Sequence, residues 1–148
     1  GPGYDLFVFK DDHSPGYYYD QFDVADPKSF RRSVYRFVVR SVPDPFMETL
    51  DCADPSQNVP ARNNTITALQ ALSVFNNPFV VKQSEYFAER AQSSASDPNT
   101  QLVAAFRLAL GRAPEAEELQ ALRGLAAKHN LASACRVLFN SNEFTFVD

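Results

Sequence analysis

Three arginines recur four residues apart in one segment of the chain, at Arg32, Arg36 and Arg40. On a helix this spacing places their guanidinium groups along one face, where they could bind phosphate, sulfate or carboxylate groups. The acidic side chains of the following segment, notably Asp44, Asp51 and Asp54, are alternative partners. We favour this second interpretation, in which the arginines tether a loop to a helix.

Acidic side chains are concentrated in the first 26 residues. Their oxygens could bind Ca²⁺ if the segment folds back on itself. The candidate ligands are Asp11, Asp12, Asp20 and Asp23. Their spacing does not fit an EF-hand loop, because the required Gly and terminal Glu positions are missing. We therefore interpret the segment as a solvated acidic loop and keep the metal site as the alternative.

The same segment is rich in aromatic residues, at Tyr17, Tyr18, Tyr19 and Phe22. Exposed tyrosines beside acidic or amide side chains can stack on sugar rings, which would make a polysaccharide-binding surface. The other interpretation is that at least alternate rings close the core.

The sequence indicates no self-sufficient catalytic site. Neither His13 nor His129 has a nucleophile motif beside it, and His129 is expected near a helix carboxyl end, where the dipole favours an imidazolium. Cys52 and Cys135 suggest neither a disulfide framework nor a metal site, so we interpret both as free thiols and keep a Cys52–Cys135 bridge in an oxidising compartment as the alternative. We expect no cofactor to be bound by this chain.

Length and composition are those of one globular domain: 148 residues, 45% of them hydrophobic, with a formal charge of −4. The negative charge does not favour nucleic acid as a partner. The longest apolar stretches are far shorter than the roughly 20 residues that span a bilayer, so we expect no membrane span.

The hydrophobic spacing predicts an all-α or mainly α fold of about five or six helices in a single domain, residues 1–148. Asp26-Pro27 and Asp97-Pro98 each place a capping side chain before a proline at the first helical position. The expected parts are an irregular aromatic and acidic segment with a possible short strand (1–26), a helix (27–40), a Pro-rich loop (41–62) and a helical bundle with a carboxyl-terminal tail (63–148).

Five strings along the chain look like one ordered block of signatures. They are residues 31–37 (RRSVYRF), 51–55 (DCADP), 64–72 (NTITALQAL), 76–79 (NNPF) and 138–144 (LFNSNEF). Together they resemble the carboxyl-terminal domain of unknown function in large exported planctomycete and verrucomicrobial proteins, whose amino-terminal regions often carry cytochrome-c-like domains. The resemblance covers nearly the whole chain.

This resemblance implies an extracytoplasmic location (periplasm or cell surface) and a multidomain parent protein, and it suggests that this chain is only the distal part of the family domain. The upstream domains of the parent would be its partners. Haem in that family is attached by a CxxCH motif in the upstream domain, and this sequence contains no such motif.

We therefore expect a non-catalytic interaction or structural module that positions the upstream domains. The alternative is a carbohydrate-binding module. A third hypothesis makes the chain part of an enzyme whose site needs upstream residues, with Arg32, Arg36 and Asp51 as its contribution.

Overall fold

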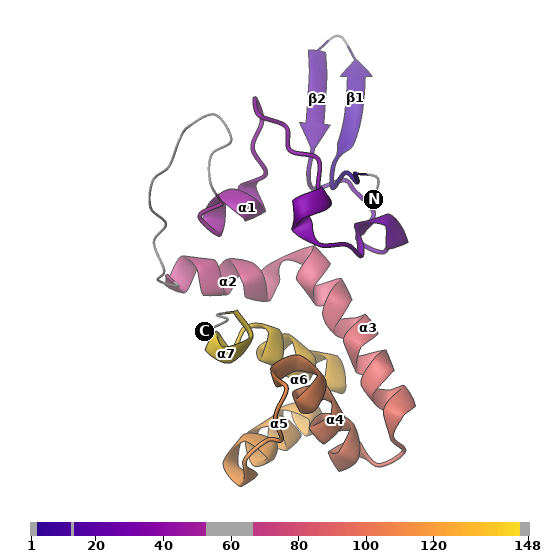
Figure 1. Ribbon diagram of the computed structural model, residues 1–148, viewed down its shortest axis with the longest axis vertical. Helices are drawn as coiled ribbons and strands as arrows, with labels where there is room; N and C mark the ends of the chain where they lie inside the picture. Colours follow the sequence, from indigo (N-terminus) through magenta and orange to yellow (C-terminus); the bar gives the residue numbers. More distant parts are fainter. Residues whose placement is uncertain (1–2, 13, 53–66, 146–148) are drawn as a thin grey trace. The chain divides into compact units, whose positions relative to one another are not determined.

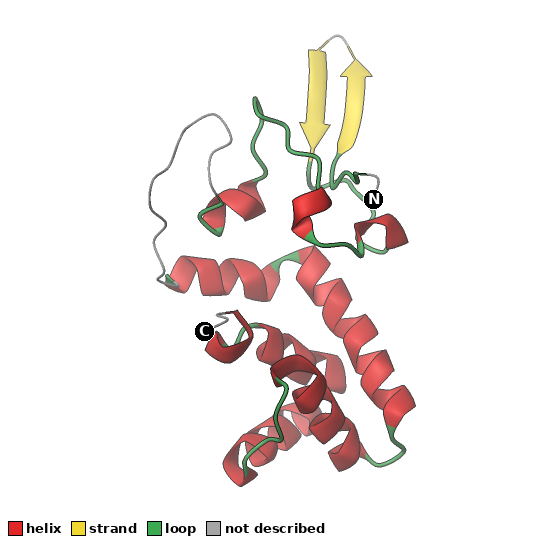
Figure 2. Ribbon diagram, viewed as in Figure 1, coloured by secondary structure: helices red, strands yellow, loops and turns green. Residues whose placement is uncertain are grey.

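The computed structural model describes residues 3–12, 14–52 and 67–145. These residues form seven α-helices, two short 3₁₀ turns and one pair of strands, so the chain is mainly α, as predicted (Figures 1 and 2). They divide into two compact units, which we call the amino-terminal unit (residues 1–73) and the helical unit (residues 74–148). Each unit is described by itself, and the expectation of one domain stays a prediction.

The amino-terminal unit begins with an antiparallel hairpin of β1 (Val8–Asp12) and β2 (Ser14–Tyr18), in which Phe9 lies opposite Tyr17. The possible short strand expected within residues 1–26 is thus present, and it is paired with a second strand. Tyr4 lies outside the hairpin and makes a single parallel bridge with Arg36.

The helix expected over residues 27–40 is wrong. This segment forms only two 3₁₀ turns, η1 (Pro27–Ser29) and η2 (Ser33–Tyr35). The backbone N–H of Tyr4 donates to the carbonyl of Tyr35 at 3.2 Å, and the N–H of Phe37 donates to the carbonyl of Tyr4 at 2.9 Å. These bonds use the Tyr35 carbonyl and the Phe37 N–H, which would form hydrogen bonds within the segment if it were a helix. The apolar side chains of this segment are also not packed along one buried face, as a stable short helix would require, since Val34 is 74% and Phe37 56% exposed.

The segment from 41 to 62 was expected to be an irregular loop, but it contains a short helix, α1 (Pro45–Thr49). Asp44 caps this helix, and Pro45 occupies its first turn. The same cap-plus-proline pattern predicts helix starts elsewhere in the sequence, so the signal for α1 was present. Residues 53–62 lie outside the described part of the chain.

Helix α2 (Ala68–Asn76) begins with a reciprocal cap. The Thr67 hydroxyl oxygen accepts from the N–H of Gln70 at 3.2 Å, while the Gln70 side-chain oxygen accepts from the N–H of Thr67 at 2.9 Å. This exchange satisfies two backbone donors at the start of the helix. Thr67 therefore caps α2.

The helical unit begins within α2 and continues through five further helices. They are α3 (Pro78–Ser94), α4 (Pro98–Leu110), α5 (Ala116–Lys128), α6 (Leu131–Phe139) and α7 (Asn142–Thr145). Asn77, Asp97 and Asn130 cap α3, α4 and α6, which confirms the cap expected at Asp97, and Gly111 adopts the left-handed conformation after α4 with φ of 73°. Within the described residues, no helix has the length and apolar character needed to cross a membrane.

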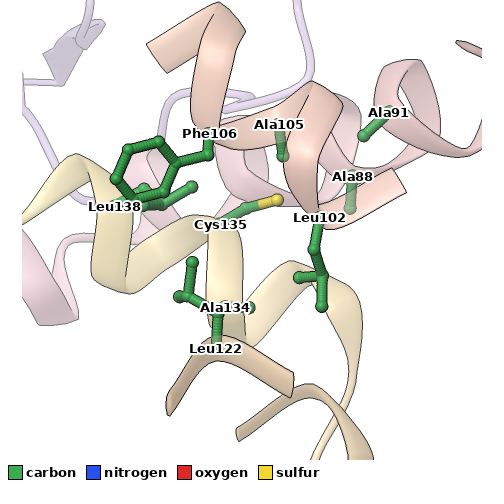
Figure 3. Close-up of a cluster of buried hydrophobic side chains, with 9 residues drawn as sticks. All are labelled: Ala88, Ala91, Leu102, Ala105, Phe106, Leu122, Ala134, Cys135 and Leu138. Carbon is green, nitrogen blue, oxygen red and sulfur yellow. The ribbon is translucent and has the colours of Figure 1, made fainter. Parts of the chain in front are cut away.

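Helix α6 occupies the centre of the helical unit and packs against α3, α4 and α5. Figure 3 shows the buried cluster that these helices share. Its members are Ala88, Ala91, Leu102, Ala105, Phe106, Leu122, Ala134, Cys135 and Leu138. Four of the nine are alanines, which allow helix axes to approach closely. The cluster closes around Cys135, which is fully buried.

Candidate functional site

The Arg36 side chain is the polar centre of the amino-terminal unit. The Tyr4 bridge fixes the backbone on both sides of it, and the side chain is only 6% exposed. One guanidinium nitrogen, Nη2, donates to Oδ2 of Asp44 in a partly buried ion pair. This pair confirms the prediction that an arginine tethers the segment containing Asp44, although the arginine lies in an irregular segment instead of on a helix.

Asp44 divides its two oxygens between two tasks. Oδ2 accepts from Arg36, while Oδ1 accepts from the N–H of Phe46 at 2.7 Å and more weakly from that of Met47 at 3.4 Å. One carboxylate therefore caps α1 and holds the arginine. Both functions favour its charged form.

Tyr19 connects the hairpin to the same cluster. Its ring centre lies 6.0 Å from the Arg36 guanidinium carbon, and its hydroxyl donates to the carbonyl of Val42 at 2.6 Å. Burial raises the pKa of Tyr19, and burial also lowers the pKa of Arg36. We call the set Tyr4, Tyr19, Arg36 and Asp44 the arginine clamp, because it joins the hairpin, the η2 segment and α1.

The other two predicted arginines do not join Arg36. Arg32 and Arg40 are both exposed, and neither side chain forms a hydrogen bond or ion pair with the described residues. The single helical face expected for the three arginines is therefore wrong. Asp51 accepts a hydrogen bond from the Gln70 side-chain nitrogen at 2.5 Å, so in the described structure its partner is an amide instead of an arginine.

The predicted aromatic surface is divided by the alternation of β2. Tyr17 and Tyr19 pack edge-on against Phe7, with ring centres 5.1 and 5.7 Å from it. Tyr18 points to the opposite face, is 40% exposed, and has the Lys10 ammonium 5.0 Å from its ring centre. Phe22 is partly buried.

The candidate calcium ligands are spread along the segment. Asp11 lies on β1 and is exposed, Asp12 is the last residue of that strand, and Asp20 is exposed in a turn. Asp23 accepts from the N–H of Ala25 at 2.9 Å, which is a local turn interaction. Among the described residues, no group of three or more His, Cys, Asp or Glu side chains could hold a metal ion.

A second charged cluster, in the helical unit, was not predicted. Arg112 donates to both carboxylate oxygens of Glu118 at 2.7 and 2.8 Å, and to both of Glu143 at the same two distances. Its Nη1 also donates to the carbonyl of Ala113 at 3.2 Å, and its guanidinium carbon lies 4.9 Å from the Phe106 ring centre. The arginine thus joins the start of α5 to α7.

The sequence did contain part of the signal for this cluster. Glu118 stands three residues after Glu115 and forms a capping box with it, and this spacing is a local signal for a carboxylate fixed at the helix start. The contribution of Glu143 comes from a residue 31 positions away from Arg112 and has no local signal.

These hydrogen bonds favour the ionised carboxylates. The hydrogen bond from Arg112 lowers the pKa of Glu118 from an ordinary 4.5 to about 2, and the same arginine lowers the pKa of Glu143. Carboxylates held ionised in this way are poor proton donors near neutral pH, so the cluster does not resemble an acid/base pair.

The described histidine and cysteines also have structural explanations. His129 ends α5, where its backbone N–H donates to the carbonyl of Leu125 at 3.0 Å. Both cysteines are free, with Cys52 exposed and Cys135 buried. Burial raises the pKa of the Cys135 thiol to about 12, which keeps it protonated and unreactive.

Comparison with known proteins identifies the family of this chain. A family model described as a protein of unknown function (DUF1553) matches residues 8–126. The chain belongs to the DUF1553 family. No curated protein and no solved structure matches the chain significantly. The expected membership in a family of unknown function is thus confirmed, while the planctomycete setting and the cytochrome-c-like neighbours stay predictions.

We predict that Arg36→Ala destabilises the amino-terminal unit of this DUF1553 chain by about 3–5 kcal/mol, because it leaves the Asp44 carboxylate partly buried without its cation. Adding Asp44→Asn should recover part of this loss, since an asparagine can still cap α1. The measurement is urea unfolding followed by near-ultraviolet circular dichroism of tyrosine, because five of the six tyrosines lie in residues 1–73.

Arg40→Ala is the matched control for this experiment, because Arg40 is exposed and unpaired within the described residues. It should change the free energy of unfolding by less than about 0.5 kcal/mol. Equal losses for the Arg36 and Arg40 variants would contradict a tethering role for Arg36.

We also predict that acid destabilises the helical unit through Glu118. Because the pKa of Glu118 is lower in the folded chain, the unfolded chain binds more protons as the pH falls below 4.5, and stability decreases toward pH 2. Glu118→Gln should reduce this dependence, leaving the smaller contribution of Glu143. The pH dependence of stability is measured by thermal unfolding, followed by far-ultraviolet circular dichroism at pH values of about 6, 4 and 3.

The control is Glu117→Gln, since Glu117 is exposed on the same helix and forms no ion pair with the described residues. That variant should keep the pH dependence of the natural chain. The prediction fails if Glu118→Gln and Glu117→Gln behave alike.

Proposed function

We propose that this chain is a non-catalytic interaction module of a larger exported multidomain bacterial protein, in which it positions the upstream domains. The observation that supports this proposal is the unequal burial of apolar side chains in the two units. Fourteen large hydrophobic residues of the described chain are exposed, and eleven of them lie in residues 1–73. Two of the eleven buried hydrophobic residues, Tyr4 and Val39, lie there.

The exposed residues of the amino-terminal unit are spread along its described segments. They are Phe9, Tyr18, Phe30, Val34, Tyr35, Phe37, Val38, Val42, Leu50, Leu69 and Leu72. Single exposed apolar residues are ordinary on protein surfaces, but a concentration of this kind marks an interaction surface. The helical unit has the opposite character, with a closed core and three exposed large hydrophobic residues among those described.

The polar clusters support a structural role in the same way. The arginine clamp joins three segments of the amino-terminal unit, and the Arg112 cluster joins two helices of the helical unit. Each uses its cation to hold a carboxylate of the chain itself, and the five donated hydrogen bonds of Arg112 leave none of its N–H groups for a substrate. The hypothesis of a partial enzyme site made from Arg32, Arg36 and Asp51 draws no support from this geometry, since Arg36 pairs with Asp44 and Asp51 accepts from Gln70.

Polysaccharide binding remains the second candidate, supported by the exposure of Tyr18. Its ring lies over Gly16, where an added Cβ would come within 2.7 Å of the ring. A flat ring 40% exposed beside the Lys10 ammonium could stack on an acidic sugar. Packing of Tyr17 and Tyr19 in the hairpin restricts this candidate to one tyrosine, so we rank it below the interaction module.

Calorimetry with neutral and acidic polysaccharides, with and without Ca²⁺, tests this second candidate. Saturable binding that is lost in Tyr18→Ala and kept in Tyr35→Ala would establish it, because Tyr35 is a comparably exposed tyrosine of the same unit. Heats at the level of buffer dilution for the folded chain would exclude it for those sugars.

The main proposal predicts that deleting this chain from the parent protein loosens the arrangement of the upstream domains. Small-angle X-ray scattering of the intact and truncated proteins should show a broader distribution of shapes after deletion. The isolated chain should show no hydrolytic or redox turnover. The proposal is overturned by turnover of the isolated chain, or by an upstream arrangement that is unchanged when the chain is removed.

A further inference from the structure

One segment of the amino-terminal unit combines exposed apolar side chains with an unusual local charge. Residues 30–42 contain four arginines and neither Asp nor Glu. Residues 1–73 as a whole contain seven Lys and Arg against ten Asp and Glu, and the chain carries a formal charge of −4. The segment is therefore a basic stretch in acidic surroundings.

The chain holds this segment in a defined conformation. The backbone bonds of Tyr4 to Tyr35 and Phe37 fix its middle, and the Tyr4 hydroxyl donates to the carbonyl of Arg31 at 3.3 Å. Arg36 points inward to Asp44. A partner would thus meet a surface whose backbone is already ordered, which lowers the entropic cost of binding.

Apolar side chains on this ordered backbone face solvent. Val34 is 74% exposed, and Phe37 and Val38 are each 56% exposed. Val39, the residue after Val38, is buried, with only 6% of its surface exposed. Arg36 and Val39 therefore anchor the segment to the unit. The neighbouring side chains of Val34, Phe37 and Val38 are exposed to solvent.

Two cations flank the exposed apolar residues. Arg32 precedes them and Arg40 comes after them, and neither guanidinium has a partner among the described residues. Each could make paired hydrogen bonds with a carboxylate. Arginine and aromatic residues around an apolar centre are the composition that protein interfaces favour.

We propose that residues 32–40 are a docking site for an acidic protein surface, whose carboxylates pair with Arg32 and Arg40 around an apolar patch that covers Val34, Phe37 and Val38. The inference rests on the proposed function, because it names the surface through which the module contacts the rest of its parent. It adds the chemistry of the partner: carboxylates at the rim and apolar side chains at the centre.

The charge distribution favours protein over an anionic bilayer as the partner. The two flanking arginines provide only a weak attraction to a negatively charged lipid surface. Repulsion of that surface comes from the exposed aspartates of the same unit, Asp5, Asp11, Asp20 and Asp23. A protein surface can place its carboxylates at the two arginines alone and avoid these aspartates.

Hydrogen–deuterium exchange measured on this chain alone and within the intact parent tests the proposal. The amides of residues 30–42 should exchange more slowly in the parent, and this protection should decrease at high salt, where ion pairs are screened. Charge reversal by Arg32→Glu with Arg40→Glu in the parent should abolish the protection, and Val34→Ser with Val38→Ser should reduce it.

The matched control is Arg90→Glu with Arg107→Glu, which makes the same change of charge at exposed arginines of the helical unit. It should leave the protection of residues 30–42 unchanged. Circular dichroism of every variant checks folding, and Arg32→Gln with Arg40→Gln replaces the charge-reversed pair if that pair does not fold.

The outcomes separate this inference from the proposed function. Protection elsewhere on the chain, with none at residues 30–42, would overturn the docking site and leave the interaction module standing. Absence of any protection in the parent would overturn both. Protection that survives charge reversal, or that appears on phosphatidylglycerol vesicles and not in the parent, would show that the partner is not an acidic protein surface.

Discussion

Among the described residues, a capping side chain before a proline begins four elements, and both units contain such starts. The pairs are Asp26-Pro27 at η1, Asp44-Pro45 at α1, Asn77-Pro78 at α3 and Asp97-Pro98 at α4. In each, the side-chain oxygen satisfies a backbone N–H that the new turn leaves open, and the proline restricts φ to a helical value. The cap does not set the length of the element that it begins. After Pro78 the helix runs for 17 residues because Ser84, Ala88 and Ala91 are buried along one side, whereas after Pro27 only one turn forms.

The helical unit could be predicted from the sequence because its signals are local. Caps lie within three residues of the groups that they satisfy, and the apolar spacing of α4 and α6 reports the faces that are buried. The amino-terminal unit depends on long-range contacts that have no local sequence signal. The Tyr4 hydroxyl donates to the carbonyl of Arg31, 27 residues away, and the Tyr19 hydroxyl donates to that of Val42, 23 residues away. Apolar spacing after Pro27 predicted a helix, and pairing with Tyr4 prevented it. The arginine tether was predictable as chemistry, since Asp44 is nearby in sequence, but its geometry was not.

The two arginine clusters solve different physical problems. Arg36 is removed from solvent, so its charge must be compensated by Asp44 at the place where burial would otherwise be costly. Arg112 remains 40% exposed and gains from geometry instead, because its planar donors match two carboxylates at once. Exposed pairs of this kind add little stability individually, but here they fix where the short helix α7 lies. In both clusters the cation is paired within the chain, which distinguishes them from Arg32 and Arg40 in the described part of the structure.

The central position of α6 has a consequence for the order in which the chain can fold during synthesis. Helices α3, α4 and α5 leave the ribosome before α6, yet three residues of the shared cluster, Ala134, Cys135 and Leu138, belong to that last large helix. Until they emerge, the apolar faces of the earlier helices have no common surface to cover them. Proteins grow by about 5–20 residues per second, which is slow compared with helix formation. The helical unit therefore passes through a stage in which α3, α4 and α5 have been synthesised but the shared core has not formed. The core can form only when nearly all residues of the unit have been synthesised.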